Sequence, residues 1–98
     1  MSGSAQGSPE KLQIYGLVQG IGDAVVQNDI DRVEFFRIQL ALIVELMPNS
    51  AVQAKPIDVA LWRVFEVSGK WMRKVKGYTA DKVSEAVKTA IPLINQSY

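Results

Sequence analysis

Basic and aromatic side chains gather in one short segment of the chain, residues 70–78. Lysine and arginine can neutralise phosphate groups, and an exposed aromatic ring can stack on a base. The candidate contacts to an anion or a nucleic acid are Arg63, Lys70, Arg73, Lys74, Lys76 and Tyr78. The favoured alternative is an ordinary solvated face, because cations in the last turn of a helix complement the negative end of its dipole. Nucleic acid is therefore the second choice of partner.

Catalytic and metal-binding side chains are scarce. The chain has no cysteine and no histidine, which excludes a disulfide, a thiolate zinc site and a cysteine nucleophile, and removes the commonest general base. A carboxylate pair is the remaining option for catalysis. Glu34 and Glu45 would lie about 16 Å apart along one helix, which is too far for paired acid–base chemistry. We therefore expect a protein that is not an enzyme and holds no cofactor or metal.

Two short patterns imitate ligand-binding motifs. The glycines around Gly20 form a broken dinucleotide fingerprint, and the chain is too short for the fold that uses it. The acidic residues of segment 29–34 resemble the start of a calcium loop, but the glycine and the later bidentate glutamate are missing at the required spacing. Carboxylates in a first helical turn are ordinary helix chemistry, so neither pattern predicts a site.

Small and large apolar side chains suggest a helix–helix interface. Gly16 and Gly20 would lie one helical turn apart, and small residues let another helix approach closely. The segment at 29–47 carries a second apolar stripe that a small core has little room for. The candidate interface residues are Gly16, Gly20, Phe35, Leu42 and Leu46. The preferred partner is a protein, either a second copy of the chain or a partner helix. The alternative is tight packing within the chain.

The length of 98 residues fits one domain. Hydrophobic residues make up 48% and charged residues 21% of the chain, as in globular proteins. The net charge is only +1, yet residues 1–50 carry three basic and six acidic side chains, and residues 51–98 carry eight basic and four acidic ones. No apolar run reaches the roughly 18–20 residues that a membrane span needs, and no targeting signal is visible. We expect a cytoplasmic or otherwise intracellular protein.

Helix-start signals place the first two elements. Ser8-Pro9-Glu10 begins a helix that runs to about residue 27. Its glycines weaken this prediction and leave a strand at 12–18 as the rival. Asp29 caps the second helix, which runs to about Met47. Apolar residues cover most of its circumference, which is typical of a central, buried helix, and Arg37 shares its one narrow polar face with the glutamates.

The same signals place two further helices. Pro56 begins the third helix, and Gly77 is expected to end it, so that the basic segment forms its last turns. Thr79 caps the fourth helix, and Pro92 predicts a kink or an end near Ala90.

The short linkers favour antiparallel neighbours. The sequence therefore predicts an all-α fold, either an antiparallel four-helix bundle or an irregular relative with four to five helices. Residues 1–8 are expected to be a flexible N-terminal tail, and residues 9–98 a single helical domain. The expected function is a non-catalytic protein–protein interaction or assembly module that oligomerises or docks a partner through apolar helix faces. The alternative is a nucleic-acid-associated domain that binds phosphates through residues 70–76.

Overall fold

A computed structural model describes residues 9–44 and 55–97 of the chain, and both parts are helical. The helices are α1 (Pro9–Val26), α2 (Ile30–Val44), α3 (Pro56–Met72) and α4 (Ala80–Ser97). The prediction of an all-α four-helix fold is confirmed, and the rival strand at 12–18 is wrong. The expected flexible tail and the expected second-helix end at Met47 lie outside the described residues. None of the described helices is long and apolar enough to cross a bilayer.

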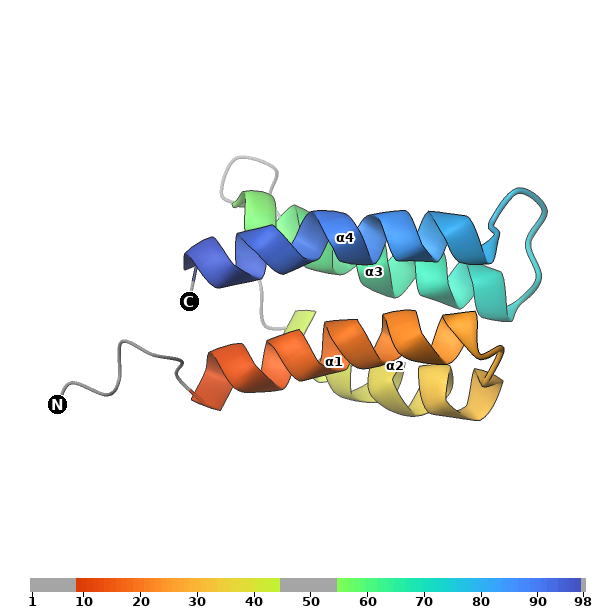
Figure 1. Cartoon of the computed structure of the whole chain (residues 1–98), viewed down its shortest axis with the longest axis horizontal. Coiled ribbons are helices and arrows are strands. Elements are labelled where there is room, and N and C mark those ends of the chain that lie inside the picture. Colours follow the sequence, from red (N-terminus) through yellow and green to blue (C-terminus); the bar gives the residue numbers. More distant parts are fainter. Residues whose placement is uncertain (1–8, 45–54, 98) are drawn as a thin grey trace, which may run out of the picture.

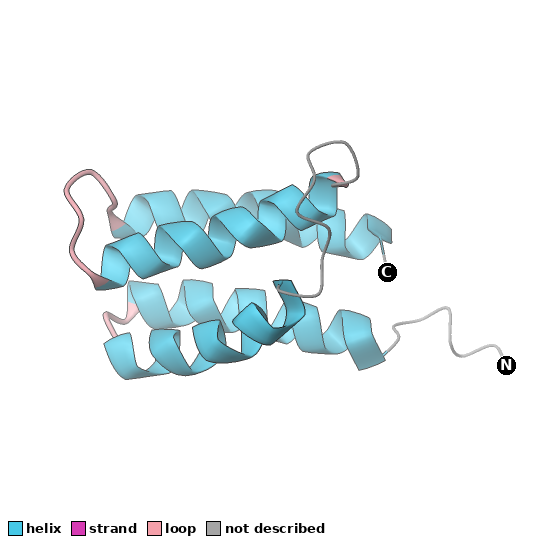
Figure 2. Ribbon diagram, turned by 180° about the vertical axis from the view of Figure 1, so that it is seen from behind, coloured by secondary structure: helices cyan, strands magenta, loops and turns pink. Residues whose placement is uncertain are grey.

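Each helix runs antiparallel to the two that flank it. α1 packs against α2 and α4, and α3 packs against the same two helices, while α1 and α3 touch only lightly across the diagonal. Figure 1 shows α1 and α4 in front, with α2 and α3 behind them. Figure 2 shows the opposite side, with α2 and α3 nearer the viewer. One side of the bundle is therefore formed by α1 and α4, and the opposite side by α2 and α3.

The core is built from aliphatic side chains at helical spacing. α1 gives a continuous buried stripe, because its residues at i, i+3, i+4 and i+7 face the bundle axis. The largest fully buried side chains are Ile14, Val18, Ile21, Val33, Leu40, Val44, Leu61, Val64, Val83 and Ile94, together with Ser68. These side chains come from all four described helices, so the helices enclose a single core.

The turn between α1 and α2 is closed by backbone geometry. Asn28 adopts a left-handed conformation with φ 56°, and the next N–H, that of Asp29, donates to the carbonyl of Ala24 at 2.8 Å. This is the hydrogen-bond pattern of a Schellman cap, in which asparagine is the best substitute for glycine. The Asp29 side chain then accepts from the N–H of Arg32 at 3.2 Å. The prediction that Asp29 caps the second helix is confirmed.

The third helix ends earlier than predicted. α3 stops at Met72, and the N–H of Val75 donates to the carbonyl of Lys70 at 3.0 Å. Lys74 occupies the left-handed position of this cap, with φ 59°. A non-glycine residue is unfavourable in that conformation, so a lysine at this position does not predict a helix end. The expected end at Gly77 is wrong, because Gly77 instead makes a separate turn with φ 89°.

The second helix is not central. It contacts α1 and α3 but has no substantial contact with α4, and its buried residues are Val33, Leu40 and Val44 alone. The prediction of a central, most buried helix is wrong, because in a bundle of four each helix has only two close neighbours. The second apolar stripe of α2 therefore has nothing within the described chain to cover it.

The fourth helix continues beyond Pro92. α4 begins at Ala80, directly after the predicted cap Thr79, and continues to Ser97 with Pro92 inside it. The expected end near Ala90 is wrong. Pro92 is exposed, so its ring meets solvent, and the buried residues Ala90 and Ile94 hold the helix on the core from either side. Tertiary packing here outweighs the local preference of proline.

Candidate functional site

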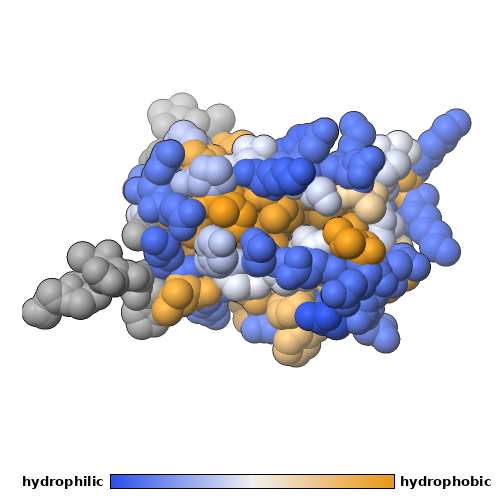
Figure 3. All heavy atoms as spheres, viewed as in Figure 1, coloured by the Kyte–Doolittle hydropathy of each residue, from blue (hydrophilic) through white to orange (hydrophobic). Residues whose placement is uncertain are grey.

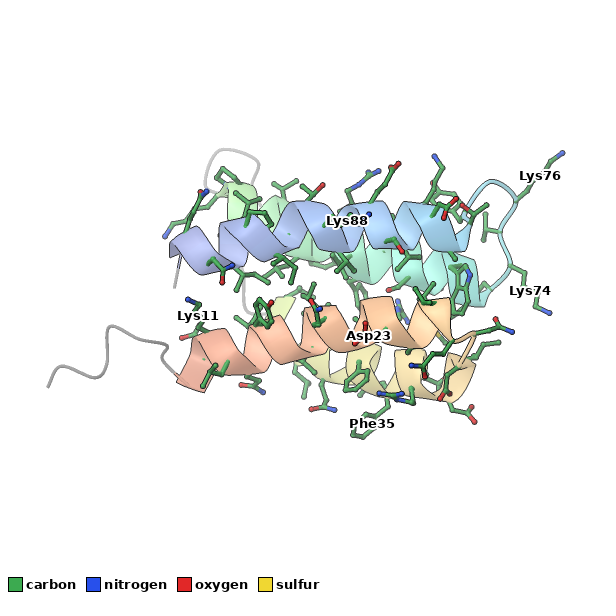
Figure 4. All side chains as sticks on the ribbon, viewed as in Figure 1. Lys11, Asp23, Phe35, Lys74, Lys76 and Lys88 are labelled. Atoms are coloured by element: carbon green, nitrogen blue, oxygen red, sulfur yellow. The ribbon has the colours of Figure 1, made fainter. Side chains whose placement is uncertain are left out.

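The outer face of α2 carries three large apolar side chains in solvent. Phe35, Ile38 and Leu42 are 61%, 59% and 64% exposed. Their spacing of three and four residues puts them on one face of the helix, opposite the buried Val33 and Leu40. Figure 4 shows Phe35 pointing away from the bundle. We call Phe35, Ile38 and Leu42 the α2 ridge.

Charged side chains flank the α2 ridge at its N-terminal end. Glu34 lies towards one side of the ridge and Arg32 lies towards the other, while Asp31 lies in line with the ridge one turn before Phe35, and all three are exposed. The Arg32 guanidinium donates to the side-chain oxygen of Gln27 at 3.3 Å and lies 5.8 Å from the centre of the Phe36 ring. These contacts hold the positive charge on the α1 side of α2. The ridge therefore has an acidic flank and a basic flank.

Arg37 fixes the rotation of α2 against α3. Its Nε donates to the carbonyl of Phe65 at 3.2 Å and to Oγ of Ser68 at 3.1 Å. The guanidinium stacks 4.3 Å from the centre of the Phe65 ring. Burial lowers the pKa of Arg37, as does the nearby Arg73, while Glu34 acts in the opposite direction. Arginine stays protonated in proteins, so its charge is available for these contacts. The sequence places Arg37 on the one narrow polar face of its helix, and the structure shows that Arg37 faces α3 from there.

The two interface glycines lie in different surroundings. At Gly20, an added Cβ would stand only 2.8 Å from Cε2 of Phe36, so Gly20 lets α1 and α2 approach each other within the chain. At Gly16, an added Cβ would meet nothing within 4 Å. Gly16 therefore lies on an open surface, and Gly20 belongs to the interior packing. Leu46, the remaining predicted interface residue beside Phe35 and Leu42, lies outside the described residues.

A shallow groove runs between α1 and α4. It has a volume of about 410 Å³, and its apolar lining residues are Tyr15, Gly22, Val26, Val87, Ile91 and Pro92. Asp23 stands on its α1 edge and Lys88 on its α4 edge. Figure 3 shows hydrophobic surface between these two helices, with hydrophilic residues on both sides. We call this feature the α1–α4 groove.

The groove was not found by sequence reasoning. Tyr15, Gly22 and Val26 do recur at helical spacing on α1, and this was the available signal. This second stripe was not recognised, because the same helix has a longer apolar stripe that forms the core. Only the position of α4 distinguishes a groove wall from a surface residue.

The basic segment divides into a helical part and a loop. Lys70, in the last turn of α3, lies 4.8 Å from the centre of the Tyr78 ring and 3.4 Å from its hydroxyl. Arg73, Lys74 and Lys76 are exposed, and Figure 4 shows the last two projecting from the α3–α4 loop. Arg63, also exposed, lies a little over two turns before the end of α3. The basic segment was expected to form the last turns of the third helix. That expectation is wrong for Arg73, Lys74 and Lys76, because α3 ends at Met72.

Within residues 9–44 and 55–97, no three acidic side chains gather closely enough to hold a metal ion. In comparisons with known proteins, no family model, no curated protein and no solved structure matches this chain. The α2 ridge, the α1–α4 groove and the basic loop are therefore the features on which a function can be built.

Proposed function

We propose that this chain is a non-catalytic interaction module that binds another protein surface through the α2 ridge. The observation that carries the proposal is the exposure of three large apolar side chains on one helix face. Exposed apolar residues scattered singly need no explanation, but a contiguous set marks an interaction surface. An aromatic residue beside two aliphatic ones is also the composition favoured at the centre of protein interfaces.

The structure around the α2 ridge is suited to this role. The Arg37 contacts to α3 and the close Gly20–Phe36 approach to α1 hold the helix on both sides. A ridge held in this way loses little conformational freedom when a partner binds, which favours affinity. Each ridge side chain contributes about 1.5–3 kcal/mol when it is fully buried, and part of this is still available on the free surface.

Site-specific photocrosslinking tests the proposal. We would place p-benzoylphenylalanine at Phe35 and, as a matched exposed control, at Glu85 on α4. Irradiation in cells that produce the chain, and of the concentrated purified protein, should give a discrete protein adduct from position 35 alone. Adding Leu42→Gln to the same chain should abolish that adduct. An absence of adduct from position 35 above the control level, in cells and in purified protein alike, would refute the proposal.

A second candidate function is binding of an anionic polymer by the basic loop. Exposed cations at Arg73, Lys74 and Lys76 favour it. The Tyr78 ring already lies against Lys70, so stacking on a base is the weaker part of this candidate. The double variant Arg73→Glu with Lys74→Glu should abolish binding to a short mixed-sequence nucleic acid at low salt without unfolding the domain. Binding that is absent in the wild type, or unchanged in the variant, would remove this candidate.

A further inference from the structure

We propose that the occupant of the α2 ridge is the α1–α4 groove of a second copy of this chain, so that the protein associates head to tail. This inference rests on the proposed function and names its partner. The ridge is convex and apolar, and the groove is concave and apolar. The two features lie on different sides of the bundle, with α1 and α4 in front in Figure 1 and α2 behind. One copy can therefore offer both at once.

Charge complementarity selects the groove and the direction of docking. The groove has Lys88 on its α4 edge and Asp23 on its α1 edge. The ridge has Glu34 on one flank and Arg32 on the other, and both are exposed. When the incoming α2 runs antiparallel to α1, the acidic flank faces Lys88 and Arg32 faces Asp23. The opposite direction would place like charges together, which costs affinity.

The lengths of the two surfaces also agree. With Arg32 opposite Asp23, Leu42 lies about 15 Å further along the incoming helix at a rise of about 1.5 Å per residue. The same distance along α1, in its N-terminal direction, leads to Leu12, whose side chain is 65% exposed. On this register Leu42 meets Leu12 about one turn beyond Tyr15, the groove residue nearest the N-terminal end of α1.

A concave partner suits the ridge better than a second ridge does. Two convex helix faces of three residues each cover little of one another, and association must first offset the loss of translational and rotational freedom. The groove covers each ridge side chain from two helices, α1 and α4. The contact joins two different surfaces, so it is heterologous and can be repeated from copy to copy.

Analytical ultracentrifugation with complementary variants tests the inference. The ridge variant carries Phe35→Gln and Leu42→Gln, the groove variant carries Leu12→Gln and Lys88→Glu, and the control carries Val59→Gln. All of these positions are exposed, so the fold should survive, and circular dichroism checks this. The wild type and the control should rise above the monomer mass of 10.8 kDa with concentration. Each of the other two variants should associate at least tenfold more weakly.

Mixing gives the decisive result. The ridge variant keeps its groove and the groove variant keeps its ridge, so an equal mixture should form a one-to-one dimer that grows no further. In one chain, Glu34→Lys with Lys88→Asp should restore association that Lys88→Asp alone weakens. A groove variant that associates as well as the wild type, or a mixture that stays monomeric, would overturn the inference. A monomeric wild type whose Phe35 crosslinks to a different protein would overturn it too, yet leave the proposed function standing.

Discussion

The pair of glycines on α1 offers a direct test of how closely α1 and α2 approach each other. Gly16 and Gly20 lie four residues apart in the interior of one helix. Replacing either with alanine removes the same backbone entropy from the unfolded chain and should gain about 1 kcal/mol of helix stability. The two substitutions therefore differ only in what the new methyl group meets.

The two substitutions are expected to change the free energy of unfolding differently. At Gly16 the methyl group enters open space, so Gly16→Ala should stabilise the fold by about 0.5–1 kcal/mol. At Gly20 it would stand 2.8 and 2.9 Å from two ring carbons of Phe36, well inside the favourable carbon–carbon separation of about 3.5–4.0 Å. Overpacking of this kind costs about 1–3 kcal/mol. Gly20→Ala should therefore range from nearly neutral to destabilising by about 2 kcal/mol.

Thermal unfolding followed by circular dichroism measures both changes. For a domain of this size, 1 kcal/mol corresponds to about 4–8 °C in Tm, so the two variants should be easy to separate. Combining Gly20→Ala with Phe36→Leu should recover part of the loss, because the shorter side chain makes room for the methyl group. Equal stabilisation by Gly16→Ala and Gly20→Ala would refute the close approach of the two helices at Gly20.

Three further predictions concern stability. Lys74→Gly should stabilise the fold by about 1 kcal/mol by relieving the left-handed conformation that caps α3, whereas Lys76→Gly, which removes the same charge, should not; thermal melts of the pair that agree would contradict the capping assignment. Ile21→Ala should cost about 2–5 kcal/mol in urea unfolding, because the side chain is fully buried, and a loss below 1 kcal/mol would argue against its place in the core. Ser68→Ala should cost about 1–2 kcal/mol by removing one acceptor of the Arg37 guanidinium, and an unchanged midpoint in the same assay would exclude that contribution.

The sequence predicted the helices well where the signals are local. Asp29 before an apolar run and Pro56 at a first helical position act through the hydrogen bonds and φ angles of adjacent residues, so no tertiary information is needed. The helical spacing of Ile14 and Ile21 likewise outweighed the glycines between them, because burial of a whole face contributes more than the propensity of single residues. These features led to the correct fold class.

The sequence could not say which apolar residues lie outside. Phe35 and Leu40 belong to the same apolar helix, and only the placement of α1 and α3 makes the first a surface residue and the second a core residue. Arg37 shows the converse, because this charged side chain faces α3, where the carbonyl of Phe65 and Oγ of Ser68 accept its hydrogen bonds. The groove at Asp23 and Lys88 needs two helices that are far apart in the chain. Local periodicity thus determined what this protein is built from, while packing decided which faces remain free, because a helix face is buried only where another element meets it.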